Sequence, residues 1–467
     1  MADTAHTHPH DPLIDADDDG LRDVVALTPA ALPAFAKSSK AFVQGVLEDA
    51  SFKAKAGETV LIPGQDGKLK GVVFGLGETA DVMALRALAA KLPAGDYHLM
   101  AEGLDATAAA TAFALGSYRF DRYKARGADR ARLYVPGADV DEARSVAHAC
   151  ALARDMVNTP ANDLGPRQIE TIAHEIAQQY GATFSVITGD DLLAENYPAV
   201  HAVGRAAVAE RAPRMVELQW GSSGPLIAIV GKGVVFDTGG LDIKPSSGMR
   251  LMKKDMGGAA HALALARMVM AAKLPVRLAV LIPAVENAIS GDAMRPGDVL
   301  QTRKGLTVEV GNTDAEGRLI LADALTRAGE LSPDLTIDLA TLTGAARVAL
   351  GPQVIPFYTA DDTLAVELAA AAAVTADPLW RLPLWAGYLD ALDSDIADLK
   401  NDPDAWAQAG SVTAALFLQK FAPTHGAWVH LDIYAWNPKG RPGWPSGAEA
   451  QSIRALYALI RGRYAHA

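Results

Sequence analysis

The spacing of apolar residues divides the chain into two regions in which strands alternate with helices. In the first region, continuous apolar runs are typical of strands, and runs with apolar residues on one face are typical of helices. The expected strands lie at 59–62, 72–75 and 97–101, and the expected helices lie near 82–92 and 106–114. This order predicts a compact α/β unit.

An alanine-rich stretch flanked by charged residues separates that unit from the rest of the chain. Its pattern predicts a helix from Asp139 to about Val157. The helix is expected to end before Pro160, because a proline disfavours the helical conformation in the residue before it. We expect this helix to link two domains.

Beyond residue 160 the alternation of strands and helices is clearer. The expected strands lie at 226–230, 277–283, 307–310 and 335–339, and the expected helices lie at 258–272 and 318–328. Strands that alternate with helices favour a mostly parallel sheet covered on both faces. Ligands of such sheets bind beyond the carboxyl ends of the strands, which is where the chemistry is expected.

The length of the chain refines this picture. At 467 residues it is long enough for two domains. We expect a flexible acidic tail over residues 1–20, an N-terminal α/β domain over 21–138, the linker helix over 139–160 and a catalytic α/β domain over 161–467. The tail contains His6, His8 and His10, which we interpret as solvated side chains rather than a metal site.

The charge balance and the cysteine content exclude several classes of function. A net charge of −12 offers no basic surface for nucleic acid or anionic membranes, so we expect neither partner. Cys150 is the single cysteine, so an intramolecular disulfide is excluded and a buried position is expected. No stretch is apolar for long enough to span a bilayer, and the N-terminus lacks the apolar run of a signal peptide. The sequence therefore predicts a cytoplasmic protein.

Charged residues gather at the turns that follow the expected strands. They are Lys232, Asp237, Lys244 and Asp255 after the strand at 226–230, and Asp314, Glu316 and Arg318 after the strand at 307–310. Glycines lie beside most of them, and glycine lets the backbone approach a ligand closely. These turns are therefore candidates for a binding site.

The carboxylates of this set are expected to converge on one edge of the sheet, where they repel each other unless a cation lies between them. Hard divalent cations take such oxygen ligands, and two ions roughly 3.5 to 4 Å apart need bridging carboxylates. The pKa of a lysine falls beside two dications, so Lys232 is a candidate ligand as a neutral amine. Lys244 and Arg318 are expected to stay charged and to stabilise a developing oxyanion.

Single members of the set also have structural interpretations. Asp255 is a candidate N-cap of the helix that follows it, and the segment from Asn312 to Asp314 is a candidate turn. The joint occurrence of all these residues in this order favours a site.

The segments around these residues resemble the leucyl aminopeptidases, the cytosol aminopeptidase or M17-type family of dinuclear metallopeptidases. The resemblance covers about residues 150–435 and is strongest at Asn312-Thr-Asp-Ala-Glu-Gly-Arg-Leu319. Further matching segments are Val230–Asp237, Asp242–Lys244, Met252–Ala260, Glu286-Asn287, Arg295-Pro-Gly-Asp298, Ala340-Thr-Leu-Thr-Gly344, Ala397-Asp398 and His430-Leu-Asp432. The resemblance implies a small N-terminal α/β domain similar to a macro domain, a larger catalytic α/β domain with a mostly parallel central sheet, and a homohexamer that acts on peptides.

The same resemblance implies roles for the clustered residues. One metal ion would be held by Asp237, Glu316 and both the side chain and the carbonyl of Asp314, and the other by Lys232, Asp237, Asp255 and Glu316. Lys244 would be the electrophile, and Arg318 would carry a bicarbonate that acts as general base. A metal-bridging water would attack the first peptide carbonyl, and binding of the substrate α-amine to one ion would confine cleavage to the N-terminal residue. Manganese, zinc or magnesium would occupy the sites.

The resemblance also implies a substrate pocket beside the metals. Its residues would be Met252, Asn312, Ala315, Thr341, Leu342 and Gly344, a largely apolar set that favours an aliphatic N-terminal side chain. For Met252 and Leu342, core packing is the alternative interpretation. The chain departs from the family after Asp432, where Tyr434 and Trp436 replace a small, glycine-containing loop and bear on the side-chain preference.

Two other functions stay open. A two-metal phosphoesterase uses similar carboxylate clusters, although Lys232 as a ligand and the lack of a metal-binding histidine set argue against it. Some members of the family bind DNA, and a non-enzymatic role of this kind is the second alternative. The acidic charge balance argues against it.

Overall fold

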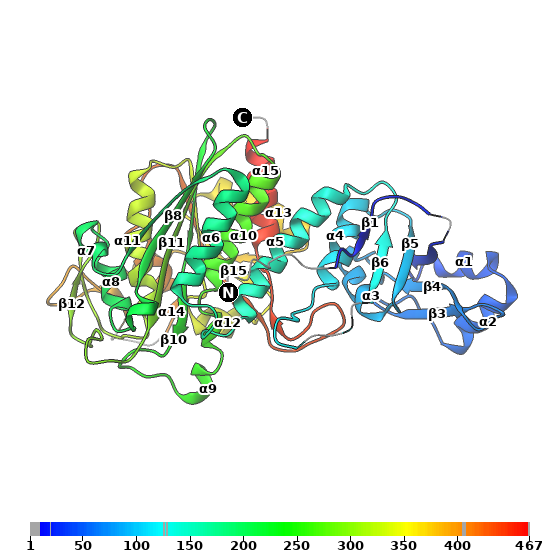
Figure 1. Cartoon of the computed structure of the whole chain (residues 1–467), viewed down its shortest axis with the longest axis horizontal. Helices are drawn as coiled ribbons and strands as arrows, with labels where there is room; N and C mark the ends of the chain where they lie inside the picture. The colour runs from blue at the N-terminus through cyan, green and yellow to red at the C-terminus, as the bar shows by residue number, and fades with distance from the viewer. Residues whose placement is uncertain (1–9, 19, 125–126, 128, 404–407, 466–467) are drawn as a thin grey trace. The chain divides into compact units, whose positions relative to one another are not determined.

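The chain folds into two compact units. The computed structural model describes residues 10–18, 20–124, 127, 129–403 and 408–465, so His6 and His8 lie outside the described residues. One unit comprises the described residues up to Ala151 together with Asn437–Gly447, and the other comprises Leu152–Trp436 together with the residues from Ala448 onward. Helix α5 (Val140–Asn158) runs from the first into the second, where the sequence predicts the linker helix (Figure 1).

The first unit is built on a six-stranded sheet with the order β1-β6-β5-β2-β4-β3. Neighbouring strands are parallel except β3 and β4, which are antiparallel. Its strands are β1 (Leu13–Ile14), β2 (Arg22–Leu27), β3 (Thr59–Pro63), β4 (Leu69–Gly75), β5 (Gly95–Ala101) and β6 (Ala131–Tyr134). Its helices are α1 (Leu32–Ser38), α2 (Ala41–Asp49), η1 (Val82–Ala84), α3 (Leu85–Lys91) and α4 (Ala106–Gly116).

Strand β1 lies within the range for which the sequence predicts a flexible tail. Leu13 and Ile14 pair with Leu133 and Tyr134 of β6, and Leu13 is buried. Regular structure therefore begins before residue 20, because these two apolar residues pair with a strand that is distant in the sequence.

The second unit contains a nine-stranded sheet with the order β16-β15-β18-β14-β9-β11-β8-β7, and β10 pairs with β11. The central strands β18, β14, β9 and β11 are mutually parallel, whereas β8, β7 and the β15–β18 pair are antiparallel. The strands are β7 (Thr183–Thr188), β8 (Arg214–Trp220), β9 (Leu226–Gly231), β10 (Gly233–Asp237), β11 (Arg277–Asn287), β14 (Leu335–Ala340), β15 (Ile355–Tyr358), β16 (Leu379–Arg381) and β18 (Ala427–Asp432). The parallel centre confirms the predicted α/β fold.

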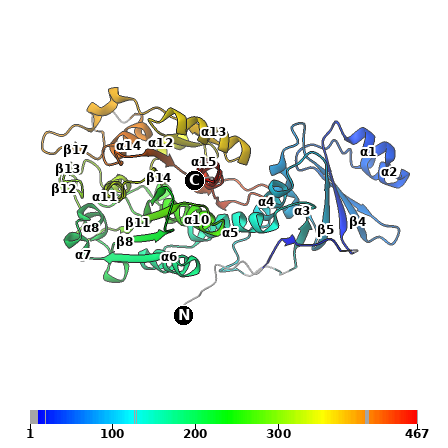
Figure 2. The same cartoon turned by 90° about the horizontal axis from the view of Figure 1, so that it is seen from above.

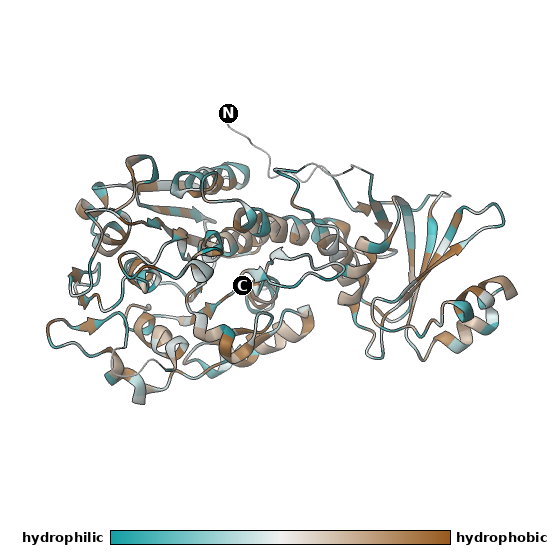
Figure 3. Ribbon diagram, turned by 90° about the horizontal axis from the view of Figure 1, so that it is seen from below, coloured by the Kyte–Doolittle hydropathy of each residue, from teal (hydrophilic) through white to brown (hydrophobic). Residues whose placement is uncertain are grey.

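Helices cover both faces of this sheet. Helices α6 and α10 pack on one face and α8 and α11 on the other (Figure 2). The longer helices are α6 (Pro166–Tyr180), α8 (Pro198–Gly204), α10 (Gly257–Ala271), α11 (Glu316–Glu330), α12 (Gly344–Leu350), α13 (Asp362–Thr375), α14 (Gly410–Gln419) and α15 (Ile453–Tyr464). The short elements are α7 (Asp191–Ala194), η2 (Ala209–Arg211), α9 (Ser246–Met249), η3 (Met252–Lys254), η4 (Ala386–Leu392), β19 (Trp436–Asn437) and β20 (Gly447–Ala448). Every residue of β9 and β14 is buried, and hydrophobic segments run through the strands of both units (Figure 3).

The strand expected at 307–310 forms, but it lies outside the central sheet. As β13 (Thr307–Glu309) it pairs with β12 (Val299–Gln301) and β17 (Leu399–Lys400) in a separate three-stranded sheet. The apolar pattern of a short strand predicts extended backbone and not the identity of its partners. Asp314 and Glu316 follow this strand as expected, and the helix expected at 318–328 forms as α11, which begins at Glu316.

No helix in the described part of the chain combines the length and apolar character needed to cross a membrane. Cys150 is buried and forms no disulfide, as the sequence predicts.

Candidate metal centre

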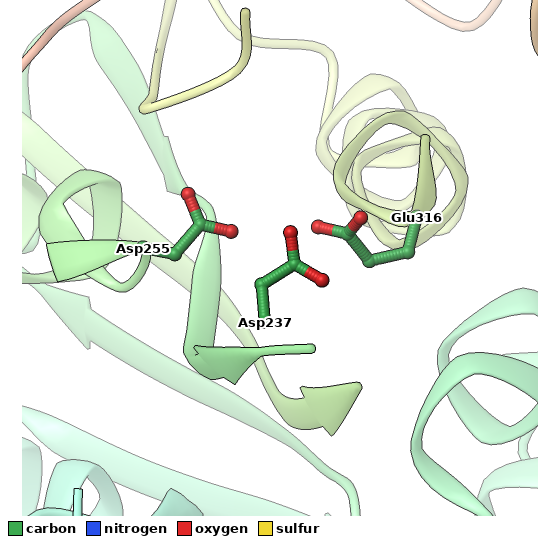
Figure 4. A group of neighbouring side chains, drawn as sticks. All are labelled: Asp237, Asp255 and Glu316. Atoms are coloured by element: carbon green, nitrogen blue, oxygen red, sulfur yellow. The ribbon is translucent and has the colours of Figure 1, made fainter. Parts of the chain in front are cut away.

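Asp237, Asp255 and Glu316 come together from different elements of the second unit. Asp237 is the last residue of β10, Asp255 follows η3, and Glu316 is the first residue of α11. Their side chains point toward one another (Figure 4), and one oxygen from each lies within 4.8 Å of the others. All are buried, so close carboxylates are held away from the water that would weaken their repulsion.

Two lysines lie among these carboxylates. Lys232, between β9 and β10, places its Nζ 2.7 Å from Asp255 Oδ2 and 3.0 Å from Glu316 Oε1. The Nζ of Lys244 lies 2.8 Å from Asp237 Oδ2 and also forms an ion pair with Asp314. The structure thus brings together the residues that the sequence predicts to cluster, and the two lysine ammonium groups balance part of the negative charge of the carboxylates.

Glycine at position 317 makes room for Lys232. A Cβ on Gly317 would lie 2.5 Å from Cε and 2.7 Å from Nζ of that lysine. A side chain at position 317 would therefore force Lys232 away from Glu316.

Burial and mutual repulsion shift the pKa values of the acidic groups. Burial, followed by the charge of Asp237, raises the pKa of Glu316 to about 8 and that of Asp314 to about 6. Burial also acts to raise the pKa of Asp255, but the positive charges of Lys232 and Lys254 together outweigh it and the net shift is downward. The cluster therefore holds protons on some of its carboxyl groups at neutral pH when no cation replaces them.

The lysines respond in the opposite sense. Burial acts to lower the pKa of Lys232, but the carboxylates of Asp255 and Glu316 outweigh it, and the pKa lies above its ordinary value. Lys244 is raised in the same way, chiefly through Asp237 after the opposing effect of burial. The depressed pKa that the sequence predicts for Lys232 concerns a site that holds dications, and it stays a prediction.

The donor set fits divalent cations. The buried Oε2 of Glu316 has no hydrogen-bond partner among the described residues. Such an orphaned acceptor is costly unless a cation meets it. Closely spaced carboxylate oxygens are the ligands preferred by hard divalent ions.

Arg318 lies in the first turn of α11 and is buried. It donates from Nη1 to the carbonyl of Asn401 at 2.6 Å, whereas its Nε has no hydrogen-bond partner in the described part of the chain. Burial lowers the pKa of Arg318, and the charges of Asp402 and Glu316 oppose that effect. Its Nε thus remains available to a buried acceptor.

Two asparagines support the cluster, and sequence reasoning gave neither of them a role. Asn287, at the end of β11, donates from Nδ2 to Asp237 Oδ1 at 2.8 Å and to the carbonyl of Thr313 at 3.2 Å. Asn401 accepts hydrogen bonds from the backbone of Gly311 at 2.7 Å and of Asn312 at 3.2 Å. Asn287 lies in a segment that resembles the family, so the sequence gave a reason to consider it. Nothing in the sequence points to Asn401.

Most residues predicted to contact substrate lie beside the cluster. The Thr341 hydroxyl donates to Asp255 Oδ1 at 2.8 Å, and the Thr341 carbonyl lies 3.4 Å from Lys232 Nζ. Asn312 forms the expected turn, because its Oδ1 accepts from the backbone of Asp314 at 2.8 Å. The remaining predicted residues are Met252 at the start of η3, Ala315 just before α11, Leu342, and Gly344 at the start of α12.

The interpretation of Asp255 as a helix N-cap is wrong. Helix α10 begins after Met256 and has no side-chain cap. The Asp255 carboxylate instead meets Lys232 and Thr341, which directs it into the cluster.

Asp432 organises the loop that carries two of these residues. Its Oδ1 accepts hydrogen bonds from the backbone of Leu342 at 2.9 Å and of Thr343 at 3.1 Å. Its Oδ2 accepts from the hydroxyls of Thr343 at 2.6 Å and of Ser411 at 3.1 Å. The carboxylate thus fixes the loop between β14 and α12 beside the cluster.

Comparisons with known proteins agree with this geometry. The model of the cytosol aminopeptidase family catalytic domain matches residues 151–457, and that of the M17 aminopeptidase N-terminal domain matches residues 23–136. A probable cytosol aminopeptidase of Syntrophotalea carbinolica is 41% identical over 366 residues, covering 74% of this chain and 73% of the relative.

Solved structures show the same likeness. A cytosol aminopeptidase from Coxiella burnetii superposes with a TM-score of 0.93 and 42% identity, covering 97% of this chain and all of that one (100%). The bottromycin maturation enzyme BotP in complex with Mn superposes with a TM-score of 0.86 and 34% identity, covering 95% of this chain and 99% of its own. These matches confirm the predicted resemblance, and the chain belongs to the cytosol aminopeptidase family, the M17 metallo-aminopeptidases.

Proposed function

We propose that this chain hydrolyses the N-terminal peptide bond of peptides with two divalent metal ions held by the carboxylate–lysine cluster. The observation that carries the proposal is the convergence of Asp237, Asp255 and Glu316 within 4.8 Å of one another in a buried position. Bound divalent cations would relieve the mutual repulsion of these carboxylates.

The ligand assignment follows the family pattern. Asp237, Glu316 and both the side chain and the carbonyl of Asp314 would hold one ion, and Lys232, Asp237, Asp255 and Glu316 the other. Such a pair of ions, when bound, supplies an activated water and polarises the reacting carbonyl. We propose manganese or zinc, with magnesium as a further choice, and the manganese in BotP supports the first.

Lys232 and Lys244 would have different roles. Lys232 lies deep in the cluster against Asp255 and Glu316, and we propose that it acts as a ligand once bound dications, which disfavour its ammonium form, take the place of its proton. Lys244 is less buried, and we propose that its ammonium stabilises the oxyanion that develops on the substrate carbonyl.

Arg318 would hold the general base. Its free Nε and its buried position suit a small planar anion, and bicarbonate is the anion that the family resemblance implies. The bicarbonate would accept a proton while the guanidinium keeps it oriented.

The remaining expectations concern the setting of the reaction. The α-amine of the substrate would bind at the cluster and confine cleavage to the first residue. The sequence predicts an apolar preference for that residue on the basis of side chains such as Met252 and Leu342. A homohexamer in the cytoplasm is the predicted assembly and location.

A metal add-back experiment tests the proposed function. After chelation, the protein should release leucine from leucyl p-nitroanilide and from short peptides only when Mn²⁺ or Zn²⁺ is restored. A folded, metal-loaded chain that releases no residue would contradict the proposal. Hydrolysis of phosphate esters with none of amides would favour a phosphoesterase instead.

A further inference from the structure

An aromatic ring with two cationic side chains close to it lies next to the carboxylate cluster. The guanidinium carbon of Arg347 is 4.4 Å from the centroid of the Tyr434 ring, and Nζ of Lys254 is 5.5 Å from the same centroid. Tyr434 is 8% exposed, and Lys254 is 5% exposed, whereas Arg347 is exposed. The group thus runs from the buried edge of the cluster to the solvent.

These cations adjoin the residues expected to contact the substrate. Lys254 ends the short helix η3 that Met252 begins. The Nη2 of Arg347 lies 3.6 Å from the position that a Cβ on Gly344 would occupy. The substrate side of the cluster therefore carries positive charge that the sequence-based expectation of an apolar pocket did not include.

Neither cation has a carboxylate of its own. The single ion pair of Lys254 among the described residues is a 3.9 Å contact with Asp255, whose carboxylate already meets Lys232 at 2.7 Å and Thr341 at 2.8 Å. The guanidinium of Arg347 forms no ion pair or hydrogen bond with the residues that the structure describes. Their donors remain available to an anion that comes from outside the chain.

From this geometry we propose that the enzyme prefers peptides whose N-terminal residue is aspartate or glutamate, with the side-chain carboxylate bound by Arg347 and Lys254. The inference rests on the proposed aminopeptidase function and revises the apolar preference predicted from the sequence. A guanidinium stays charged in proteins, and its fork matches the geometry of a carboxylate. The Tyr434 ring holds the guanidinium in place through a cation–π contact.

Glutamate and glutamine separate charge from shape, because the two side chains are nearly isosteric. The Mn²⁺-loaded protein should be assayed with the p-nitroanilides of glutamate, glutamine and leucine. A charge-assisted hydrogen bond at a partly buried site predicts a kcat/KM for glutamate at least about tenfold above that for glutamine. Free glutamate should also raise the melting temperature of the metal-loaded protein more than free glutamine does.

Substitutions at Arg347 test the residue directly, and its exposure makes misfolding a small concern. Arg347→Gln should reduce the ratio of glutamate to glutamine kcat/KM to about one, and Arg347→Lys should restore part of it. Lys254→Gln should also lower the ratio of glutamate to glutamine kcat/KM. Its rates are expressed per bound metal, because the neighbouring residue Asp255 is a proposed metal ligand. Arg441→Gln is the matched control, since this arginine also lies over an aromatic ring, Trp444 at 4.2 Å, but in the first unit.

The outcomes separate this inference from the function on which it rests. Metal-dependent release of leucine or glutamine at rates equal to or above that of glutamate would overturn the acidic preference and leave the aminopeptidase intact. An unchanged ratio in Arg347→Gln would overturn the role of that arginine. Release of none of the three residues by a folded, metal-loaded protein would overturn the proposed function itself.

Discussion

Replacing Glu316 with glutamine tests whether the clustered carboxylates exist to hold metal. The substitution keeps the shape of the side chain and removes a negative charge from a position that is 1% exposed. Burial, followed by the charge of Asp237, raises the pKa of Glu316 to about 8 in the metal-free chain, so the neutral carboxyl is favoured at pH 7. The metal-free protein should therefore accept the amide with little change in stability.

Metal binding should respond very differently. Glu316 would bridge both ions, and an amide lacks the charge that a bridging carboxylate supplies. Loss of a residue that merely supports a ligand costs about 10- to 100-fold in metal affinity, so loss of this ligand should cost more than about 100-fold. Activity should fall together with the bound metal.

The assay measures metal per chain, melting temperature and rate on the same samples. Without metal, Glu316→Gln should have the same melting temperature as the wild-type protein. Added Mn²⁺ should raise the melting temperature of the wild type and not that of the variant. Glu309→Gln is the control, because Glu309 is paired with Lys400 at 3.3 Å in β13 and lies outside the cluster. A Glu316→Gln protein that keeps both metal and activity would show that Glu316 is not a metal ligand.

Three further predictions concern the same site. Lys244→Ala should retain metal and lose about 100- to 1,000-fold in kcat, because the Lys244 ammonium is proposed to stabilise the oxyanion. Metal content is measured together with kcat, and loss of metal from the variant would contradict this role. Gly317→Ala should weaken metal binding in equilibrium dialysis, since a Cβ at position 317 would lie 2.5 Å from Lys232 Cε. Metal affinity should rise with pH through the pKa of Glu316, about 8, and continue to rise above it, because Glu316 and Lys232, whose pKa lies above its ordinary value, must both lose a proton to bind an ion. Calorimetry in buffers of different ionisation enthalpy should show that the number of protons released on binding falls by about one between pH 7 and pH 9.

The sequence predicts local structure and site chemistry well where a strong local pattern exists. The apolar runs at 226–230 and 335–339 form β9 and β14, which lie side by side at the centre of the sheet. Lys232 and Asp237 lie at one edge of this sheet, after β9 and at the end of β10, as expected for a parallel sheet, whereas Glu316 reaches them from the start of α11. Lys232, Asp255 and Glu316 meet there within hydrogen-bonding distance.

The features that the sequence did not predict depend on contacts between residues far apart in the chain. Strand β13 joins a sheet of its own, and β1 pairs with β6 more than a hundred residues away, because pairing is decided by the whole fold. Asn401 supports the turn at Asn312 from a distant loop without any local pattern. The stacking of Arg347 on Tyr434 likewise joins residues from different elements, so the charge beside the cluster became visible with the structure.

The most direct test of the central claim compares one peptide in two forms, with a free and with an acetylated N-terminus. Mass spectrometry should follow both after incubation with the chelated protein and with the protein reloaded with Mn²⁺. We expect stepwise loss of N-terminal residues from the free peptide, solely with metal, and no change in the acetylated peptide. Internal cleavage, cleavage of the acetylated peptide, or no cleavage by a folded and metal-loaded chain would contradict it.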